Sequence, residues 1–322
     1  MAVFTPVTPD QARAFIRDYG LGDVIALEPI AEGVENTNYR LETARGRHVL
    51  TLFERRTDAA GLPFCLGLTD HLATAGFPAP RPVRNGPGQW VGRLNDRPAA
   101  VIEWLDGAWL KTPGPDQVTA AGRLLADLHL KAADFPVARA NPVGPLQWRV
   151  LAERCDHRAA GDSRRMLDSL VTELDRLEST LPEGLPGGPI HADYFPDNVL
   201  FDRGRPSGVI DFYFAHVGAW AWDLAVALNA WAFDAEGRPD EVAMAAFVRG
   251  YEQGRRLERA EILALPVLGA ASAVRFTLTR LHDRLFHDPS WLVTPKDPAP
   301  FFNRIAFHRA ASAADYGLET AV

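Results

Sequence analysis

The sequence has few cysteines and no long apolar run, and each shortage excludes a class of protein. Its two cysteines, Cys65 and Cys155, are too few and too far apart for a disulfide framework or a zinc cluster. It has no run of about 18 apolar residues and no basic segment leading into an apolar stretch near Met1, so neither a membrane span nor a signal peptide is expected. The formal net charge of −7 argues against nucleic acid or a membrane surface as the main partner. We therefore expect a cytoplasmic protein with reduced thiols.

Lysine is also scarce. Only Lys111, Lys131 and Lys296 occur, and arginine supplies nearly all of the positive charge. Any role that requires a lysine in the first 110 residues therefore cannot be filled.

The first third of the chain has the pattern of a β-rich lobe. Thr8 and Gln11 form a capping-box signature around Pro9, which predicts a helix at the start. A second helix is expected over residues 58–75. Short strand-like runs separated by turn residues occur at 24–30, 36–42, 48–54, 89–94 and 98–104.

The remaining two thirds is predicted to be mainly helical. Helices are expected over residues 116–133, 163–180, 220–233, 239–254, 258–286 and 300–315. Two short strands are expected near 198–201 and 208–212, after a Pro/Gly-rich connector at 182–189. The change in character predicts an α+β protein with a β-rich lobe over residues 1–104 and a helical lobe over residues 105–322.

One group of polar residues carries the chemistry. Asp193 and Asn198 lie five residues apart between apolar segments, and Asp211 follows Asn198 by thirteen residues. If the strands near 198–201 and 208–212 pair as a hairpin, Asn198 and Asp211 come close together. Phosphoryl transfer with Mg²⁺ needs a carboxylate that accepts a hydroxyl proton, and oxygen ligands that hold the metal at the phosphates. We therefore interpret Asp193 as the catalytic base or the group that orients the hydroxyl, and Asn198 and Asp211 as Mg²⁺ ligands.

The segment from His191 to Asn198, followed by Asp211 and Phe212, resembles the catalytic loop and metal-binding aspartate of the aminoglycoside phosphotransferase and choline kinase superfamily. The absence of glycine after Phe212 fits its small-molecule branch rather than the protein kinases. The resemblance implies a two-lobed protein-kinase-like fold, ATP and Mg²⁺ as cofactors, and His191 beside Asp193 in catalysis. It also implies that Asp223 braces the catalytic loop.

The same resemblance assigns residues that bind the nucleotide. Gly33, Asn36 and Asn38 fall in the segment that covers the phosphates, and Glu103 and Trp104 fall at the hinge whose backbone reads adenine.

The lysine that pairs the phosphates in kinases is replaced, because Thr51 occupies the matching position. Either an arginine such as Arg40, Arg55 or Arg56 substitutes, or backbone amides and Mg²⁺ suffice.

A finer resemblance concerns the substrate. Several segments look like bacterial homoserine kinases of the kinase-like type: residues 33–39, 50–54, 77–80, 191–198 and 275–281. This implies L-homoserine as the small-molecule substrate. Its carboxylate needs a cation, which Arg275 or Arg280 could supply bidentately, although salt bridges are the alternative role for either arginine. Tyr194 is a further candidate substrate contact.

Other functions stay open from the sequence alone. Choline would require an aromatic box, for which Trp220, Trp222 and Trp231 are candidates, and ethanolamine or an aminoglycoside are further possible acceptors. An inactive kinase-fold binding protein is the non-enzyme alternative. The presence of Asp193, Asn198 and Asp211 argues against it. Oligomeric state is not indicated by the sequence.

Overall fold

The computed structural model describes residues 4–31, 36–54, 58–288 and 294–318. Contacts divide the chain into two compact units, Met1–Asp106 with Gly208–Tyr213, and Gly107–Ser207 with Phe214–Val322. We expected the second lobe to run unbroken from residue 105. Gly208–Tyr213 instead clusters with the first unit, where the Val209 amide donates to the Pro78 carbonyl and the Tyr213 ring packs edge-on against Phe53.

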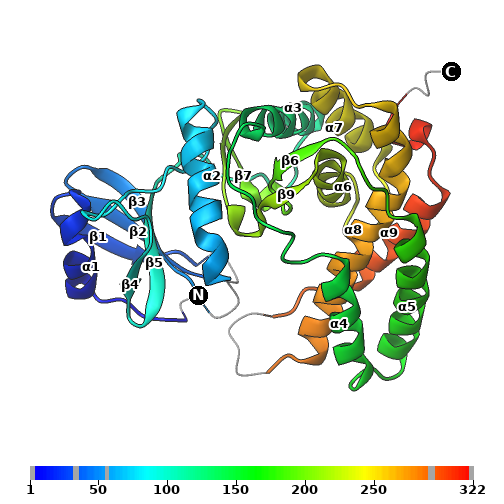
Figure 1. Ribbon diagram of the computed structural model, residues 1–322, viewed down its shortest axis with the longest axis horizontal. Coiled ribbons are helices and arrows are strands. Elements are labelled where there is room, and N and C mark those ends of the chain that lie inside the picture. Colours follow the sequence, from blue (N-terminus) through cyan, green and yellow to red (C-terminus); the bar gives the residue numbers. More distant parts are fainter. Residues whose placement is uncertain (1–3, 32–35, 55–57, 289–293, 319–322) are drawn as a thin grey trace. The chain divides into compact units, whose positions relative to one another are not determined.

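The first unit is built on an antiparallel sheet with strand order β1-β2-β3-β5-β4 (Figure 1). Its strands are β1 Val24–Pro29, β2 Thr37–Thr43, β3 Gly46–Leu52, β4 Gly92–Leu94 and β5 Arg97–Glu103. β4 and β5 are joined by Asn95 and Asp96, with φ of 48° and 60°. Asn and Asp tolerate this left-handed conformation, which a two-residue hairpin turn requires.

Each face of this sheet is covered by a different helix. Ala99 and Val101 lie in the core shared with α1 (Pro9–Ile16), whereas Ala100, between them in sequence, packs with Leu62 and Leu66 of α2 (Leu62–Thr74). Successive side chains of a strand point to opposite faces, so one strand serves both cores. The predicted capping box of α1 is confirmed by both of its hydrogen bonds.

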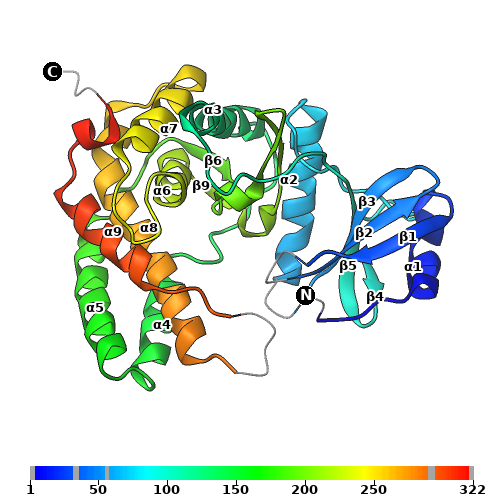
Figure 2. The same cartoon turned by 180° about the vertical axis from the view of Figure 1, so that it is seen from behind.

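The second unit is mostly helical, with α6 surrounded by α3, α7 and α8 (Figures 1 and 2). The helices are α3 Pro115–Ala132, α4 Pro145–Asp156, α5 Asp162–Thr180, α6 Trp220–Trp231, α7 Glu241–Gly254, α8 Arg259–Leu285 and α9 Ala299–Ala310. By length and hydropathy α8 would pass as a membrane span, but 67% of that apolar window is buried inside the protein. Its apolar character is therefore that of a core helix.

Two short sheets lie in the chain between α5 and α6. β6 (Gly187–Ile190) pairs with β9 (His216–Ala219), and β7 (Val199–Asp202) pairs with β8 (Arg205–Val209). The expected hairpin is confirmed, with Arg203 and Gly204 at φ of 49° and 77° in its turn. Short 3₁₀ turns lie at Arg17–Tyr19, Ala59–Gly61, Pro196–Asn198, Phe212–Phe214 and Ala313–Tyr316.

Three elements were not predicted: β6, β9 and α4. We read the segment before His191 as a connector because it is rich in glycine and proline. Its pairing with β9, which lies some thirty residues later in the chain, supplies the hydrogen bonds that its sequence does not signal.

Candidate active site

The loop between β6 and β7 holds Asp193 and Asn198, and its backbone is held by one carboxylate. Asp223, in the first turn of α6, accepts hydrogen bonds from the amides of His191 (2.8 Å) and Ala192 (2.7 Å). Ala192 has φ of 64°, a conformation that an alanine adopts only where its surroundings hold it. The expected bracing role of Asp223 is confirmed by these two bonds.

Asp193 is half-buried at the centre of the loop. The Asn198 amide nitrogen donates to its backbone oxygen (2.8 Å) and to its carboxylate (3.3 Å). Burial raises the pKa of Asp193 to about 6, although the positive charge of Arg275 opposes the rise. A carboxylate with this pKa is ionised at neutral pH and close to the pKa best suited to proton transfer.

His191 is fully buried and acts on the loop from within. Its Nδ1 accepts a hydrogen bond from the Asp193 amide (3.2 Å). This contact places His191 as a support of Asp193 and not as a group at the protein surface.

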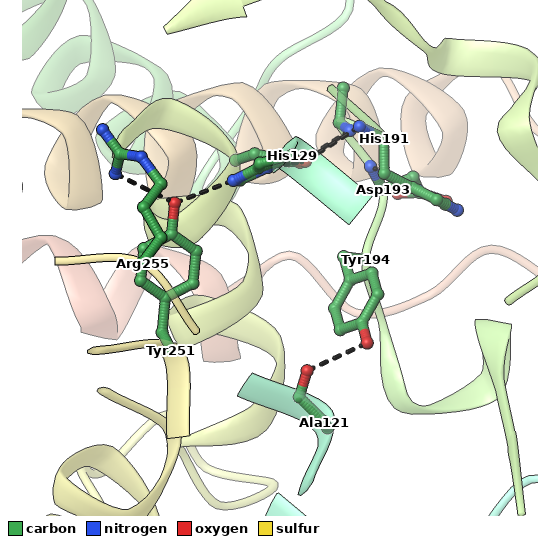
Figure 3. Close-up of polar contacts among 9 residues, drawn as sticks. Ala121, His129, His191, Asp193, Tyr194, Tyr251 and Arg255 are labelled. Carbon is green, nitrogen blue, oxygen red and sulfur yellow. Dashed lines mark hydrogen bonds and ion pairs between the residues drawn. The ribbon is translucent and has the colours of Figure 1, made fainter. Parts of the chain in front are cut away.

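Asp223 is itself held by a chain of polar side chains, of which Figure 3 shows His129, Tyr251 and Arg255. His129 on α3 contacts Asp223 through Nε2 (3.0 Å) and the Tyr251 hydroxyl through Nδ1 (2.8 Å). Arg255 donates to the Tyr251 hydroxyl (3.2 Å) and to Glu261 (2.7 Å). Burial raises the pKa of Asp223, but the bonds from His129 and the loop amides outweigh it and hold that pKa below its usual value.

Arg275 on α8 lies against the same loop. Its guanidinium donates to the Ala192 carbonyl (2.8 Å) and lies 4.5 Å from the ring centre of Phe276, and the residue is 4% exposed. We expected Arg275 to clamp the substrate carboxylate. This geometry instead makes it a support of the catalytic loop, because its charge faces the backbone of Ala192 and the carboxylate of Asp193.

Comparison with known proteins fits these features. The profile of the phosphotransferase enzyme (APH) family matches residues 26–257. This chain belongs to that family. The homoserine kinase of Methylorubrum populi is 47% identical over 320 residues, covering 99% of this chain and 100% of the relative. The homoserine kinase of Rhizobium meliloti is 44% identical over 319 residues, covering 99% and 98%.

Solved structures of other small-molecule kinases share the fold. Amicoumacin kinase bound to AMP-PNP and Ca²⁺ has a TM-score of 0.68 at 16% identity, covering 93% of both chains. A microcompartment-associated aminopropanol kinase has a TM-score of 0.66 at 21% identity, covering 97% of this chain and 99% of the other. The expected two-lobed, protein-kinase-like α+β fold is confirmed, as is the resemblance to homoserine kinases.

The family membership directs attention to the residues expected at the nucleotide, and the structure places several of them inside the first unit. The Asn36 side chain accepts from the Glu54 amide (3.2 Å), and the Asn38 side chain accepts from Thr51 (2.8 Å). Both amide groups thus join the ends of β2 and β3. Gly33 lies outside the described residues.

The hinge residues are likewise engaged by the backbone. The Glu103 amide donates to the Arg81 carbonyl (2.8 Å) and the Trp104 amide to the Arg47 carbonyl (3.2 Å). Both amides are therefore paired within the first unit, and the expected role of Glu103 and Trp104 in binding adenine stays a prediction.

Thr51, at the position of the kinase lysine, is 1% exposed. Its hydroxyl is bonded to Asn38 and also to Tyr213, whose own pKa is raised above the usual range by burial. Thr51 is therefore a neutral member of a buried polar cluster. Arg40, one possible substitute, is paired with Glu28 (3.1 Å), while Arg55 and Arg56 lie outside the described residues.

Asp211 follows β8 with φ of 65°, a left-handed conformation unusual for aspartate. It belongs to the first unit and is followed by the buried Phe212. Strained backbone of this kind clusters at functional positions, which fits the expected role of Asp211.

Tyr194 does not lie where a substrate contact would. The residue is 0% exposed, and its hydroxyl donates to the Ala121 carbonyl of α3 (3.0 Å; Figure 3). Our expectation that Tyr194 contacts the substrate is therefore corrected: its ring packs in the core beneath the loop.

Arg280, on α8, lies near Asp193. Its guanidinium lies 4.2 Å from the ring centre of Phe301, and its pKa is lowered by burial while Asp297 and Asp193 oppose that shift. Arg280 is partly exposed, unlike Arg275.

Sequence reasoning missed His129, Tyr251 and Arg255. Each lies on a helix or at its end, and each reads as an ordinary member of an amphipathic pattern. Only the crossing of α3 and α7 brings them together, so no local signal marks them.

Proposed function

We propose that this protein is an ATP-dependent homoserine kinase that forms O-phospho-L-homoserine in threonine biosynthesis, in the cytoplasm. The observation that carries the proposal is identity of 43% to 47% to homoserine kinases over almost the whole chain. The structure adds support, because Asp193 and Asn198 are both present in a loop whose backbone is hydrogen-bonded to Asp223.

Asp193 is the group that would receive the proton of the homoserine hydroxyl. Its pKa of about 6 leaves it ionised at neutral pH, and the amide of Asn198 keeps its carboxylate in place. The hydroxyl is thereby oriented toward the terminal phosphate, and positioning of this kind accounts for much of the catalysis of phosphoryl transfer.

Asn198 and Asp211 are the residues that would hold Mg²⁺. The Asn198 amide nitrogen is used by two bonds to Asp193, which leaves its oxygen as the atom available to a cation. In the part of the chain that the structure describes, no three His, Cys, Asp or Glu side chains gather to hold a metal. The ion would take its remaining ligands from water and phosphate oxygens, as Mg²⁺ commonly does, and it would neutralise charge on the phosphates.

The tryptophans that made choline an alternative are used in packing. Trp222 stacks on Trp148 with ring centres 5.8 Å apart, and the Trp231 indole donates to the Tyr194 carbonyl (2.9 Å). Trp220 is stacked against His129. An open aromatic box is therefore not supported, and an amino-acid acceptor is favoured.

The test is an assay of ADP release with Mg–ATP and one acceptor at a time: L-homoserine, choline, ethanolamine or an aminoglycoside, each at about 1 mM. We expect strong turnover with L-homoserine and little with the others. Asp193→Asn serves as the control for contaminating activity. Turnover with a different acceptor alone, or with none, would refute the proposed substrate.

A further inference from the structure

The polar chain behind the catalytic loop consists of Arg255, Tyr251, His129 and Asp223, and each hydrogen bond in it is donated toward Asp223. Asp223 can only accept, so His129 must carry its proton on Nε2, and its Nδ1 must accept from the Tyr251 hydroxyl. That hydroxyl in turn accepts from Arg255. Burial lowers the pKa of His129, which keeps the ring neutral and suited to this pair of opposite roles.

The chain ends on the catalytic loop. One Asp223 oxygen receives both His129 Nε2 and the His191 amide, and the other receives the Ala192 amide. If His129 were lost, the first oxygen would keep one donor of two, and the buried carboxylate would be free to turn. Its two bonds to the loop amides would then weaken, and with them the strained backbone that precedes Asp193.

We propose that His129, oriented by Tyr251 and Arg255, is a positioning residue for phosphoryl transfer, which it serves by fixing the Asp223 carboxylate that holds the catalytic loop. This inference rests on the proposed kinase function and adds a residue from outside the loop to its machinery. His129 touches neither substrate nor nucleotide in this role. Removing it should therefore lower kcat and leave the KM values for ATP and L-homoserine nearly unchanged.

The same unit contains a matched control. His308 on α9 contacts the Tyr316 hydroxyl through Nδ1 at 2.8 Å and the Asn229 side chain through Nε2 at 3.1 Å. His129, Tyr251, His308 and Tyr316 are all at most 1% exposed. The two His–Tyr pairs are thus alike in burial and geometry, but the second ends on Asn229 and not on the loop.

The experiment compares Tyr251→Phe with Tyr316→Phe, and His129→Leu with His129→Gln. Each tyrosine variant loses one buried hydroxyl bonded to a histidine, so both should lower the melting temperature by a similar amount. We expect only Tyr251→Phe to lower kcat, by several-fold. His129→Leu should lower kcat about 10- to 100-fold, the range known for loss of the residue that orients a metal ligand. His129→Gln should recover much of that loss, because its amide can donate to Asp223 and accept from Tyr251.

Two results would overturn the inference. One is an equal loss of kcat in Tyr251→Phe and Tyr316→Phe, since kcat would then follow stability alone. The other is a wild-type kcat in a folded His129→Leu protein. Failure of the proposed function itself would look different, because the wild-type protein would then show no turnover with L-homoserine.

Discussion

Asp193 is the residue on which the proposed chemistry depends most directly, and Asp193→Asn is its first test. The amide cannot accept the hydroxyl proton as a base, so we expect kcat to fall by about 10²- to 10⁴-fold. Affinity for Mg–ATP, measured by calorimetry, should remain close to wild type because Asn198 and Asp211 are untouched. A variant that keeps wild-type kcat would remove Asp193 from the reaction.

Asp193→Asn should raise the free energy of unfolding although it lowers kcat. Burial raises the pKa of Asp193 in the folded protein above its usual value, so folding disfavours the ionised form. This cost is absent at low pH, grows as the pH rises toward about 6, and is complete above it. Asp193→Asn removes the cost, so its free energy of unfolding in urea should exceed that of wild type at pH 8 and match it near pH 3.

The pH dependence of turnover follows from the same pKa. A base must be deprotonated to act, so kcat/KM for L-homoserine should rise tenfold per pH unit at low pH and level off above about pH 6. Charged groups that act on Asp193 include Arg275, Asp197 and Lys296, of which Arg275 has the largest effect, and Arg280 also interacts with it. Lys296→Met should therefore move the midpoint upward, because it removes a positive charge. A midpoint unmoved from wild type would show that Lys296 does not act on Asp193.

At the scale of elements, α8 presents arginines in different surroundings. Arg275 is buried against the loop, whereas Arg280 is partly exposed near Asp193 and Asp197. We propose Arg280 as the cation for the substrate carboxylate. Arg280→Ala should raise the KM for L-homoserine by about 10- to 100-fold, as expected for loss of a charge-assisted bond, and leave the KM for ATP unchanged.

Arg284→Ala is the matched control on the same helix. Its guanidinium is largely exposed and pairs with Asp297 at 3.4 Å, a surface contact of small energetic value. Kinetic constants within about twofold of wild type are expected for it. An equal effect of Arg280→Ala and Arg284→Ala on the KM for L-homoserine would contradict the assignment.

The crossing of α3 and α7 is the element contact that brings His129 to Tyr251. A Cβ on Gly122 would collide with the Phe247 carbonyl, and a Cβ on Gly250 would collide with the Thr119 carbonyl. Glycine at both positions lets the two backbones approach closely enough for the His–Tyr bond.

Gly250→Ala should therefore force the helices apart. We expect it to lower the free energy of unfolding by about 1–3 kcal/mol, the usual cost of overpacking, and to lower kcat along with it. Thermal unfolding measures the first effect and the ADP assay the second. Gly161→Ala is a less crowded comparison, because a Cβ there would meet nothing within 4 Å, although its φ of 55° adds some backbone strain. A smaller loss of stability in Gly250→Ala than in Gly161→Ala would show that α3 and α7 have room at the crossing.

At the scale of the whole molecule, the proposed reaction depends on Mg²⁺, for which Asn198 and Asp211 are the expected ligands. Removal of Mg²⁺ with EDTA should abolish ADP release, and excess Mg²⁺ should restore it. Asp211→Ala should weaken Mg-dependent binding of ATP, whereas Asp193→Asn should not. Unchanged Mg–ATP affinity in Asp211→Ala would exclude it as a metal ligand.

The sequence by itself determined the features that depend on neighbours in the chain. The Thr8–Gln11 capping box, the alternation of the strands, the turn at Arg203 and Gly204 and the long helices all follow from short-range preferences. Asp193, Asn198 and Asp211 could be proposed as well, because their spacing before and after one hairpin matches the pattern of phosphoryl transfer.

Only the tertiary structure decided which side chains support that site. Tyr194 follows Asp193 in the sequence, but its hydroxyl bonds to the Ala121 carbonyl. Arg275 belongs to a segment that resembles homoserine kinases, but its guanidinium bonds to the Ala192 carbonyl. The strand β6 exists because β9 supplies its hydrogen bonds, and His129 reaches Tyr251 because α3 crosses close to α7. Burial and hydrogen-bond pairing depend on residues far apart in the chain, so a local pattern predicts the chemistry of a site but not the contacts that hold it in place.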